Sequence, residues 1–297
     1  MIIVGGSKCR GLAEKVAQHL EARLIPLETR KFPDGEVYVR VNGELKEEDV
    51  AIIQSFAKEP NDSILELALT IDACRSLNCR EVIGVIPYMA YARQDARFNP
   101  GEPMSIEVLA RILSSIGLNH LITVDMHLHR IRDPQKLFKI PFENLTASQL
   151  IAEYFTKNFP YEDFIVVGPD VESEQWASKV ASYLNTSYVI FEKQRLSPTE
   201  VKLTASCSSD FKGKTALVVD DVISTGSTVA EAAKVSTSLG AKKVYVACIH
   251  PLLVGSALDK IMLAGASLVV ATDSIESPIS KISIAPVVAQ ALKRLMS

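Results

Sequence analysis

Several absences limit what this chain can be. It has no apolar run near the roughly 18 residues of a membrane span, and no basic segment precedes the first apolar stretch. Its 32 Lys and Arg nearly balance 35 Asp and Glu, so the formal charge of −3 provides no global positive field for a nucleic-acid backbone. The five cysteines are scattered and form no Cys-x-x-Cys pair, which argues against a disulfide framework or a thiolate zinc site. We therefore expect a cytoplasmic protein with free thiols that binds neither nucleic acid nor a membrane.

The residues that are present indicate an α/β protein of about two domains. The chain has 297 residues, 47% of them apolar and 23% charged, which is typical of a folded globular protein. Short apolar runs rich in β-branched residues alternate with helical patterns such as 62–77 and 226–239. Runs with consecutive apolar residues, such as 216–219, are typical of parallel strands covered on both faces. The candidate strands are 2–5, 36–41, 50–54, 81–86, 119–124, 164–168, 187–191, 215–219, 243–249 and 267–271.

We expect the chain to divide near its middle. Pro141 interrupts the regular alternation between 138 and 145, which predicts two doubly wound parallel-sheet domains, 1–141 and 142–284. Their layouts are similar, although no repeat is visible at the level of residues. The final segment, 285–297, is an amphipathic helix that could pack on either half.

The strongest local signal is the segment 215–228, in which a buried strand ends in Asp220 and Asp221 and a small-residue loop opens a helix. Free backbone N–H groups of such a loop and first helical turn converge on one point and can hold a phosphate. Adjacent carboxylates suit a cis-diol such as that of ribose. An ordinary turn with Ser224 or Thr225 as N-cap would fit the loop alone. The whole string favours a phosphate and ribose site formed by Asp220, Asp221, Ser224, Thr225, Gly226, Ser227 and Thr228.

Two further strings could bind a nucleotide. Segment 32–36, Phe-Pro-Asp-Gly-Glu, offers a ring that can stack on a purine and carboxylates that can accept from an adenine amine. Arg93 and Gln94 lie in a loop, where a guanidinium suits a polyphosphate. Taken alone, segment 32–36 fits a surface turn better than a nucleotide site, and Arg93 also fits a solvated loop arginine.

Two other strings carry histidine or basic residues. Strand alternation would place Asp125 and His127 on one side of the carboxyl end of strand 119–124, and we expect His129 to lie at the surface. Lys193 and Arg195 lie in a polar stretch, 192–199, which on its own fits a solvated basic turn.

These strings occur in an order that resembles the ribose-phosphate diphosphokinase family, in an archaeal-like form. The segment 220–228 resembles the phosphoribosyl-diphosphate loop of type I phosphoribosyltransferases, and the resemblance to the kinase family covers essentially the full length. The strings that carry it are Gly5-Gly6-Ser7 before Leu12-Ala13-Glu14, 32–36, Tyr91-Ala-Arg-Gln-Asp95, Asp125-Met-His127, Gly168-Pro-Asp170 and Lys193-Gln-Arg195.

The resemblance implies two domains of the type I phosphoribosyltransferase-like fold, with ATP on the N-terminal half and ribose 5-phosphate on the C-terminal half. The implied reaction transfers the β,γ-diphosphate of ATP to the C1 hydroxyl of ribose 5-phosphate. It also implies a homo-oligomer, at least a dimer, and a Mg²⁺ cofactor held by His127 and Asp170. Lys193 and Arg195 would be catalytic residues of a mobile flap, and Arg195 would also contact ribose 5-phosphate. The residues implied to line the ATP site are Phe32, Asp34, Gly35, Glu36, Arg93 and Gln94.

Some positions depart from the family pattern, and two alternatives stay open. Val171-Glu172 replaces two glycines, and segment 96–102 lacks the Lys/Ser-rich form of the phosphate-activated, hexameric branch. A phosphoribosyltransferase would share the segment 220–228 but would have no use for 32–36 and 91–95. A non-catalytic regulatory subunit would be expected to lose catalytic positions, whereas all the matched ones are present.

Overall fold

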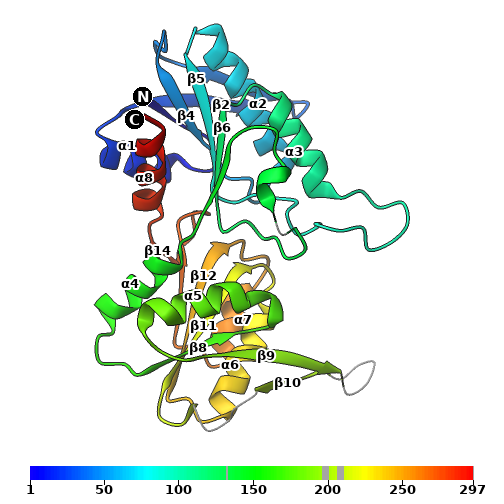
Figure 1. Cartoon of the computed structure of the whole chain (residues 1–297), viewed down its shortest axis with the longest axis vertical. Helices are drawn as coiled ribbons and strands as arrows, with labels where there is room; N and C mark the ends of the chain where they lie inside the picture. The colour runs from blue at the N-terminus through cyan, green and yellow to red at the C-terminus, as the bar shows by residue number, and fades with distance from the viewer. Residues whose placement is uncertain (132, 196–200, 206–210, 297) are drawn as a thin grey trace. The chain divides into compact units, whose positions relative to one another are not determined.

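The computed structural model describes residues 1–131, 133–195, 201–205 and 211–296. The chain forms two compact units. The first contains Met1–Thr146, Ser274–Glu276 and Ser283–Ser297, and the second contains Ala147–Asp273 and Ser277–Ile282. Each unit is built around one seven-stranded sheet (Figure 1).

The sheet of the first unit has the order β3-β2-β1-β4-β5-β6-β7. All neighbouring strands are parallel except β2 and β3, which form an antiparallel hairpin. Helix α8 packs on α1, so the C-terminal segment belongs to this unit (Figure 1). The elements are β1 (Ile2–Gly5), α1 (Arg10–Leu20), β2 (Arg23–Lys31), β3 (Val37–Val41), β4 (Asp49–Ile53), α2 (Pro60–Ser76), β5 (Glu81–Ile86), α3 (Ser105–Ser115), β6 (His120–Val124), the 3-10 turn η1 (Pro134–Lys136), β7 (Phe142–Leu145) and α8 (Ala285–Met296).

The sheet of the second unit has the order β10-β9-β8-β11-β12-β13-β14, again parallel except for one antiparallel hairpin, β9–β10. Its central strands β8, β11 and β12 are buried, which explains their consecutive apolar residues. The elements are α4 (Ser148–Asn158), β8 (Phe164–Gly168), the 3-10 turn η2 (Val171–Ser173), α5 (Glu174–Leu184), β9 (Tyr188–Arg195), β10 (Val201–Ala205), β11 (Thr215–Ile223), α6 (Ser227–Ser238), β12 (Lys243–Pro251), α7 (Ala257–Leu263), β13 (Leu268–Thr272) and β14 (Ser280–Ile282).

The observed division differs from the predicted one. The prediction ended the first half at Pro141, but the structure ends it after Thr146. The reason is β7, which follows the proline and pairs with β6, so that it completes the first sheet. All ten predicted strands are present, and β2, β7, β10 and β14 were not predicted. β2 escapes the apolar pattern because it carries Pro26 and many charged residues and is buried only at alternate positions.

The structure bears on two expectations, one about the cysteines and one about membrane-spanning segments. The four cysteines described, Cys9, Cys74, Cys79 and Cys248, are buried and form no disulfide with one another. Cys207 lies outside the described residues. A bilayer-spanning helix needs a long apolar stretch, and the helices within the described part of the chain contain none.

Candidate active site

The loop after β11 has the backbone geometry of an anion site. β11 does not end at Val219 as predicted but continues through both acids to Ile223, with Asp220 opposite Cys248 of β12. Gly226 then takes a left-handed conformation, φ 73°, and α6 begins at the next residue. The Ala230 N–H donates to the Gly226 carbonyl, 2.9 Å away, and closes the first turn. The N–H groups of the three residues before Ala230 therefore have no acceptor within the helix.

Helix α7 determines the shape of this loop. A Cβ on Gly226 would lie 2.9 Å from the Ala257 carbonyl oxygen and 3.1 Å from Cδ1 of Ile261, so only glycine fits the approach. The same helix places Lys260 at the loop, where its Nζ donates to the Thr225 carbonyl and to Oγ of Ser227, each 3.0 Å away. Sequence reasoning missed Lys260 because it lies 33 residues beyond Ser227 and only helix packing brings it there.

Three carboxylates of the second unit influence one another beside this loop. Burial raises the pKa of Asp220 well above its ordinary value, and the negative charges of Asp221 and then Asp170 raise it further. Asp170 caps the turn η2, accepting from the Ser173 N–H at 3.2 Å. This capped turn occupies the place of the two glycines expected by resemblance. Crowded carboxylates of this kind favour a cation or the hydroxyl donors of a diol, either of which relieves their repulsion.

The segment 32–36 is the exposed tip of the β2–β3 hairpin. The Phe32 N–H donates to the Glu36 carbonyl at 2.8 Å, and the Gly35 N–H donates to the Phe32 carbonyl at 2.9 Å. Gly35 has φ 97°, a conformation that favours glycine. The Phe32 ring is 40% exposed and meets Tyr38 edge-on, with centroids 5.9 Å apart. A partly exposed ring of this kind can stack on a base.

The loop 91–95 is tied to the loop after β6 by a buried acid. Asp95 accepts hydrogen bonds from the backbone N–H groups of His129, at 3.0 Å, and Arg130, at 2.8 Å. Burial alone would raise the pKa of Asp95, but these bonds lower it below its ordinary value. Arg93 is exposed, and Gln94 accepts from the hydroxyl of Ser105. Asp95 therefore holds the loop 91–95 against the loop after β6, a structural role that was not predicted from the sequence.

His127 and His129 form a close pair. Their Nε2 atoms lie 2.9 Å apart, and both side chains are half-buried. His129 is therefore partly exposed, as a surface position allows, but its ring also contacts His127. Strand alternation does not extend to Asp125, because β6 ends at Val124 and Asp125 has φ 37°.

Lys193 and Arg195 lie in β9 rather than in a loop. Lys193 pairs with Leu203 of β10, and Arg195 pairs with Val201. Their side chains, and residues 196–199 of the predicted stretch 192–199, lie outside the described part of the structure. Their catalytic role stays a prediction.

Family models match both halves of the chain. Residues 137–264 match the family model of the phosphoribosyl transferase domain. Residues 1–117 match the family model described as the N-terminal domain of ribose phosphate pyrophosphokinase.

Relatives extend this match over the whole chain. A ribose-phosphate pyrophosphokinase of Methanopyrus kandleri is 39% identical over 297 residues, with 99% of each chain covered. One of Methanothermobacter thermautotrophicus is 38% identical over 98% of this chain and 100% of that protein. The crystal structure of phosphoribosylpyrophosphate synthetase from Mycobacterium smegmatis has a TM-score of 0.87 and 28% identity, and covers 99% of this chain and 98% of that one. The chain therefore belongs to the ribose-phosphate pyrophosphokinase family, which confirms the predicted fold class and family.

Proposed function

We propose that this chain transfers the β,γ-diphosphate of ATP to the C1 hydroxyl of ribose 5-phosphate, giving 5-phospho-α-D-ribose 1-diphosphate and AMP. The observation that carries this proposal is the loop after β11. There two acids and a helix N-terminus offer a diol site and a phosphate site within one unit. The full-length similarity to ribose-phosphate pyrophosphokinases supports it.

Ribose 5-phosphate would be bound by the second unit. Its phosphate would accept from the N–H groups of residues 224–228, and its diol would donate to Asp220 and Asp221. The ammonium of Lys260, already at the loop, would add a positive charge. Arg195 would contribute from β9, as the resemblance implies.

ATP would be bound by the first unit. Phe32 would stack on the adenine, and Asp34 and Glu36 would accept from its amine, with Gly35 shaping the turn. Arg93 and Gln94 would contact the phosphates, since a guanidinium pairs well with phosphate oxygens.

The acidic residues fit a divalent cation. Burial, and then the negative charges of Asp221 and Asp170, raise the pKa of Asp220, and Mg²⁺ bound near Asp170 would offset that negative charge. We propose Asp170 and His127 as ligands, as the resemblance implies. The chemistry that Mg²⁺ supplies when bound is neutralisation of charge on the diphosphate oxygens.

The reaction needs orientation and charge stabilisation rather than a covalent intermediate. The C1 oxygen would attack the β-phosphorus in line, forming the new O–P bond as the bond to the AMP oxygen breaks and the hydroxyl proton is released. Asp220 and Asp221 would orient the sugar. Lys193 and Arg195 would stabilise the charge that develops on the transferring group.

An assay of the purified protein with ATP, ribose 5-phosphate and Mg²⁺ tests this proposal. AMP and the diphosphorylated sugar should form in equal amounts. Formation of a nucleotide from 5-phosphoribosyl 1-diphosphate and a free base would instead identify a phosphoribosyltransferase. No turnover with either pair of substrates would favour a regulatory subunit.

We also propose a cytoplasmic homo-oligomer, at least a dimer, that binds no nucleic acid. Sedimentation equilibrium should give a mass at least twice the 32.5 kDa of one chain. A monomer across the working concentration range would contradict the assembly.

Phe32→Ala is expected to raise the Michaelis constant for ATP, because stacking on adenine contributes on the order of 1 kcal/mol. The Michaelis constant for ribose 5-phosphate should not change. Initial rates with purine and pyrimidine triphosphates provide the comparison. Equal use of both classes by the parent and the variant would show that this ring does not recognise the base.

Lys260→Met is expected to raise the Michaelis constant for ribose 5-phosphate by roughly tenfold, because a charge-assisted hydrogen bond is lost at the phosphate. Lys260→Arg, which keeps the charge, should lose less. Lys234→Met on α6, where Lys234 pairs with Glu231 at 3.9 Å, is the matched control. Equal effects of the Lys234 and Lys260 methionine variants would show that Lys260 has no special place at the sugar phosphate.

A further inference from the structure

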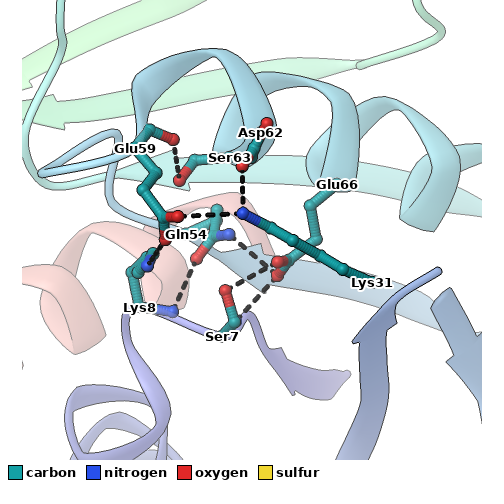
Figure 2. Close-up of polar contacts among 8 residues, drawn as sticks. All are labelled: Ser7, Lys8, Lys31, Gln54, Glu59, Asp62, Ser63 and Glu66. Carbon is teal, nitrogen blue, oxygen red and sulfur yellow. Dashed lines mark hydrogen bonds and ion pairs between the residues drawn. The ribbon is translucent and has the colours of Figure 1, made fainter. Parts of the chain in front are cut away.

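A cluster of polar residues in the first unit has no role in the proposed site (Figure 2). It lies beyond the carboxyl ends of β1 and β4, the two strands at which the strand order reverses. A cavity of about 190 Å³ opens there, lined in part by Lys8, Lys31 and Glu59. The cluster consists of Ser7, Lys8, Lys31, Gln54, Glu59, Asp62, Ser63 and Glu66.

One part of the cluster fixes the loop after β1. The buried carboxylate of Glu66 accepts from the Ser7 N–H at 2.7 Å, from the Ser7 hydroxyl at 2.6 Å and from Nε2 of Gln54 at 2.8 Å. The Lys8 N–H donates to Oε1 of Gln54 at 3.1 Å. Here the chain's own carboxylate occupies the donors that an α/β sheet offers to a ligand at this edge. The arrangement is therefore that of a structural tie and not of an open binding site.

The other part joins the end of β2 to the start of α2. Nζ of Lys31 lies 2.8 Å from Oε1 of Glu59 and 2.5 Å from Oδ2 of Asp62, and Nζ of Lys8 lies 2.6 Å from Oε2 of Glu59. We call Lys8, Lys31, Glu59 and Asp62 the hairpin clamp. Hydrogen bonds from Lys31 and then Lys8 lower the pKa of Glu59 to about 2, and hydrogen bonds to Asp62 and Glu59 raise the pKa of Lys31 above its ordinary value.

Lys31 connects the clamp to the tip of the hairpin. Lys31 is the last residue of β2, directly before Phe32 and the exposed tip 32–36. β3, the other side of the hairpin, is an edge strand; among the described strands it pairs only with β2, and it packs on α2. The ion pair between Lys31 and Asp62 therefore ties the residue directly before the tip to α2.

We infer that the hairpin clamp positions the tip 32–36 for recognition of the nucleotide base. This inference rests on the proposed function, which assigns the tip to ATP. The clamp side chains are positioning residues and do not themselves contact ATP. The side chains of Lys31 and Glu59 are nearly half exposed, and exposed ion pairs contribute little to global stability. The loss of the clamp should therefore change nucleotide binding more than it changes folding.

Lys31→Met and Glu59→Gln test the inference, with Glu28→Gln as matched control. Glu28 faces Arg40 across the same two strands, 4.0 Å away and farther from the tip. Each clamp variant should raise the Michaelis constant for ATP by roughly three- to tenfold, because a misoriented tip binds the base less well. The turnover number, the Michaelis constant for ribose 5-phosphate and the melting temperature should stay near their parental values. Lys31→Arg should restore ATP binding, and hydrogen exchange at the Phe32 and Gly35 amides should be faster in Lys31→Met than in Glu28→Gln.

Phe32→Ala, measured beside these variants, distinguishes failure of the proposed ATP site at the tip from failure of the clamp inference. If it leaves the Michaelis constant for ATP unchanged, the tip does not bind ATP and the proposed placement fails. If it raises that constant while the clamp variants behave like Glu28→Gln, the placement holds and the clamp inference is overturned. Equal increases of both Michaelis constants together with a lower melting temperature would also overturn it, since the clamp would then be a general structural contact.

Discussion

Lys193→Ala is expected to lower the turnover number by about two orders of magnitude or more, the scale of losing one charge stabiliser of a transition state. Both Michaelis constants and the melting temperature should stay nearly unchanged. This pattern follows if the lysine reaches the diphosphate only as that group transfers, because an interaction made only in the transition state raises turnover without tightening substrate binding. Steady-state kinetics with each substrate varied in turn, together with thermal unfolding, provide the measurement.

Two further variants sharpen this prediction. Arg195→Ala should behave like Lys193→Ala, and the double variant should lose less than the product of the single effects, because both cations act on one charge. Lys202→Ala, on the paired strand β10, is the control. Near-parental turnover in Lys193→Ala, or a change confined to a Michaelis constant, would contradict a transition-state role.

Gly226→Val is expected to raise the Michaelis constant for ribose 5-phosphate by roughly a hundredfold, because the loop must open where the backbone approaches the phosphate. The added side chain meets the Ala257 carbonyl and Ile261, and φ 73° disfavours any Cβ. The Michaelis constant for ATP should change far less. Asp220→Asn should also weaken the sugar site selectively, without requiring the loop to move.

Gly240→Ala is a control for the backbone strain that a side chain causes at a left-handed glycine outside the proposed phosphate site. Gly240 lies just beyond the other end of α6 with φ 95°, so alanine there meets similar conformational strain away from the loop. This control should lower the melting temperature and leave the sugar constant near its parental value. If the Gly226 and Gly240 variants affect sugar binding equally, or if Gly226→Val and Asp220→Asn both leave it unchanged, the phosphate site lies elsewhere.

Sequence reasoning was most successful where local pattern determines structure. Strands such as β8 and β12 are buried on both faces, so their apolar runs reveal them directly. The loop after β11 was predicted because a strand, two acids, small residues and a helix follow one another in the chain. β2 was missed because its charged second half follows no apolar pattern.

Contacts between segments that lie far apart in the chain could not be predicted from a single sequence. Lys260 reaches the loop only because α7 packs against Gly226. His129 pairs with His127 at a place where strand alternation has already ended. The ion pair between Lys31 and Glu59 joins positions 28 residues apart, and no periodicity connects them. The positions of such side chains depend on how helices and strands pack, which the hydrophobic pattern along the chain does not predict.

The shared strand order of the two sheets has a consequence for the origin of the chain. Reading β3-β2-β1-β4-β5-β6-β7 beside β10-β9-β8-β11-β12-β13-β14 matches each strand with one seven places later, and each sheet carries its antiparallel pair at the same edge. Duplication and fusion of one ancestral domain would produce this arrangement, even though the residues have diverged beyond visible repetition. The hairpin with Phe32 at its tip and the hairpin that carries Lys193 are then descendants of one element. In the proposed function, one copy of the hairpin would bind the nucleotide and the other would act on the diphosphate group that is transferred from it.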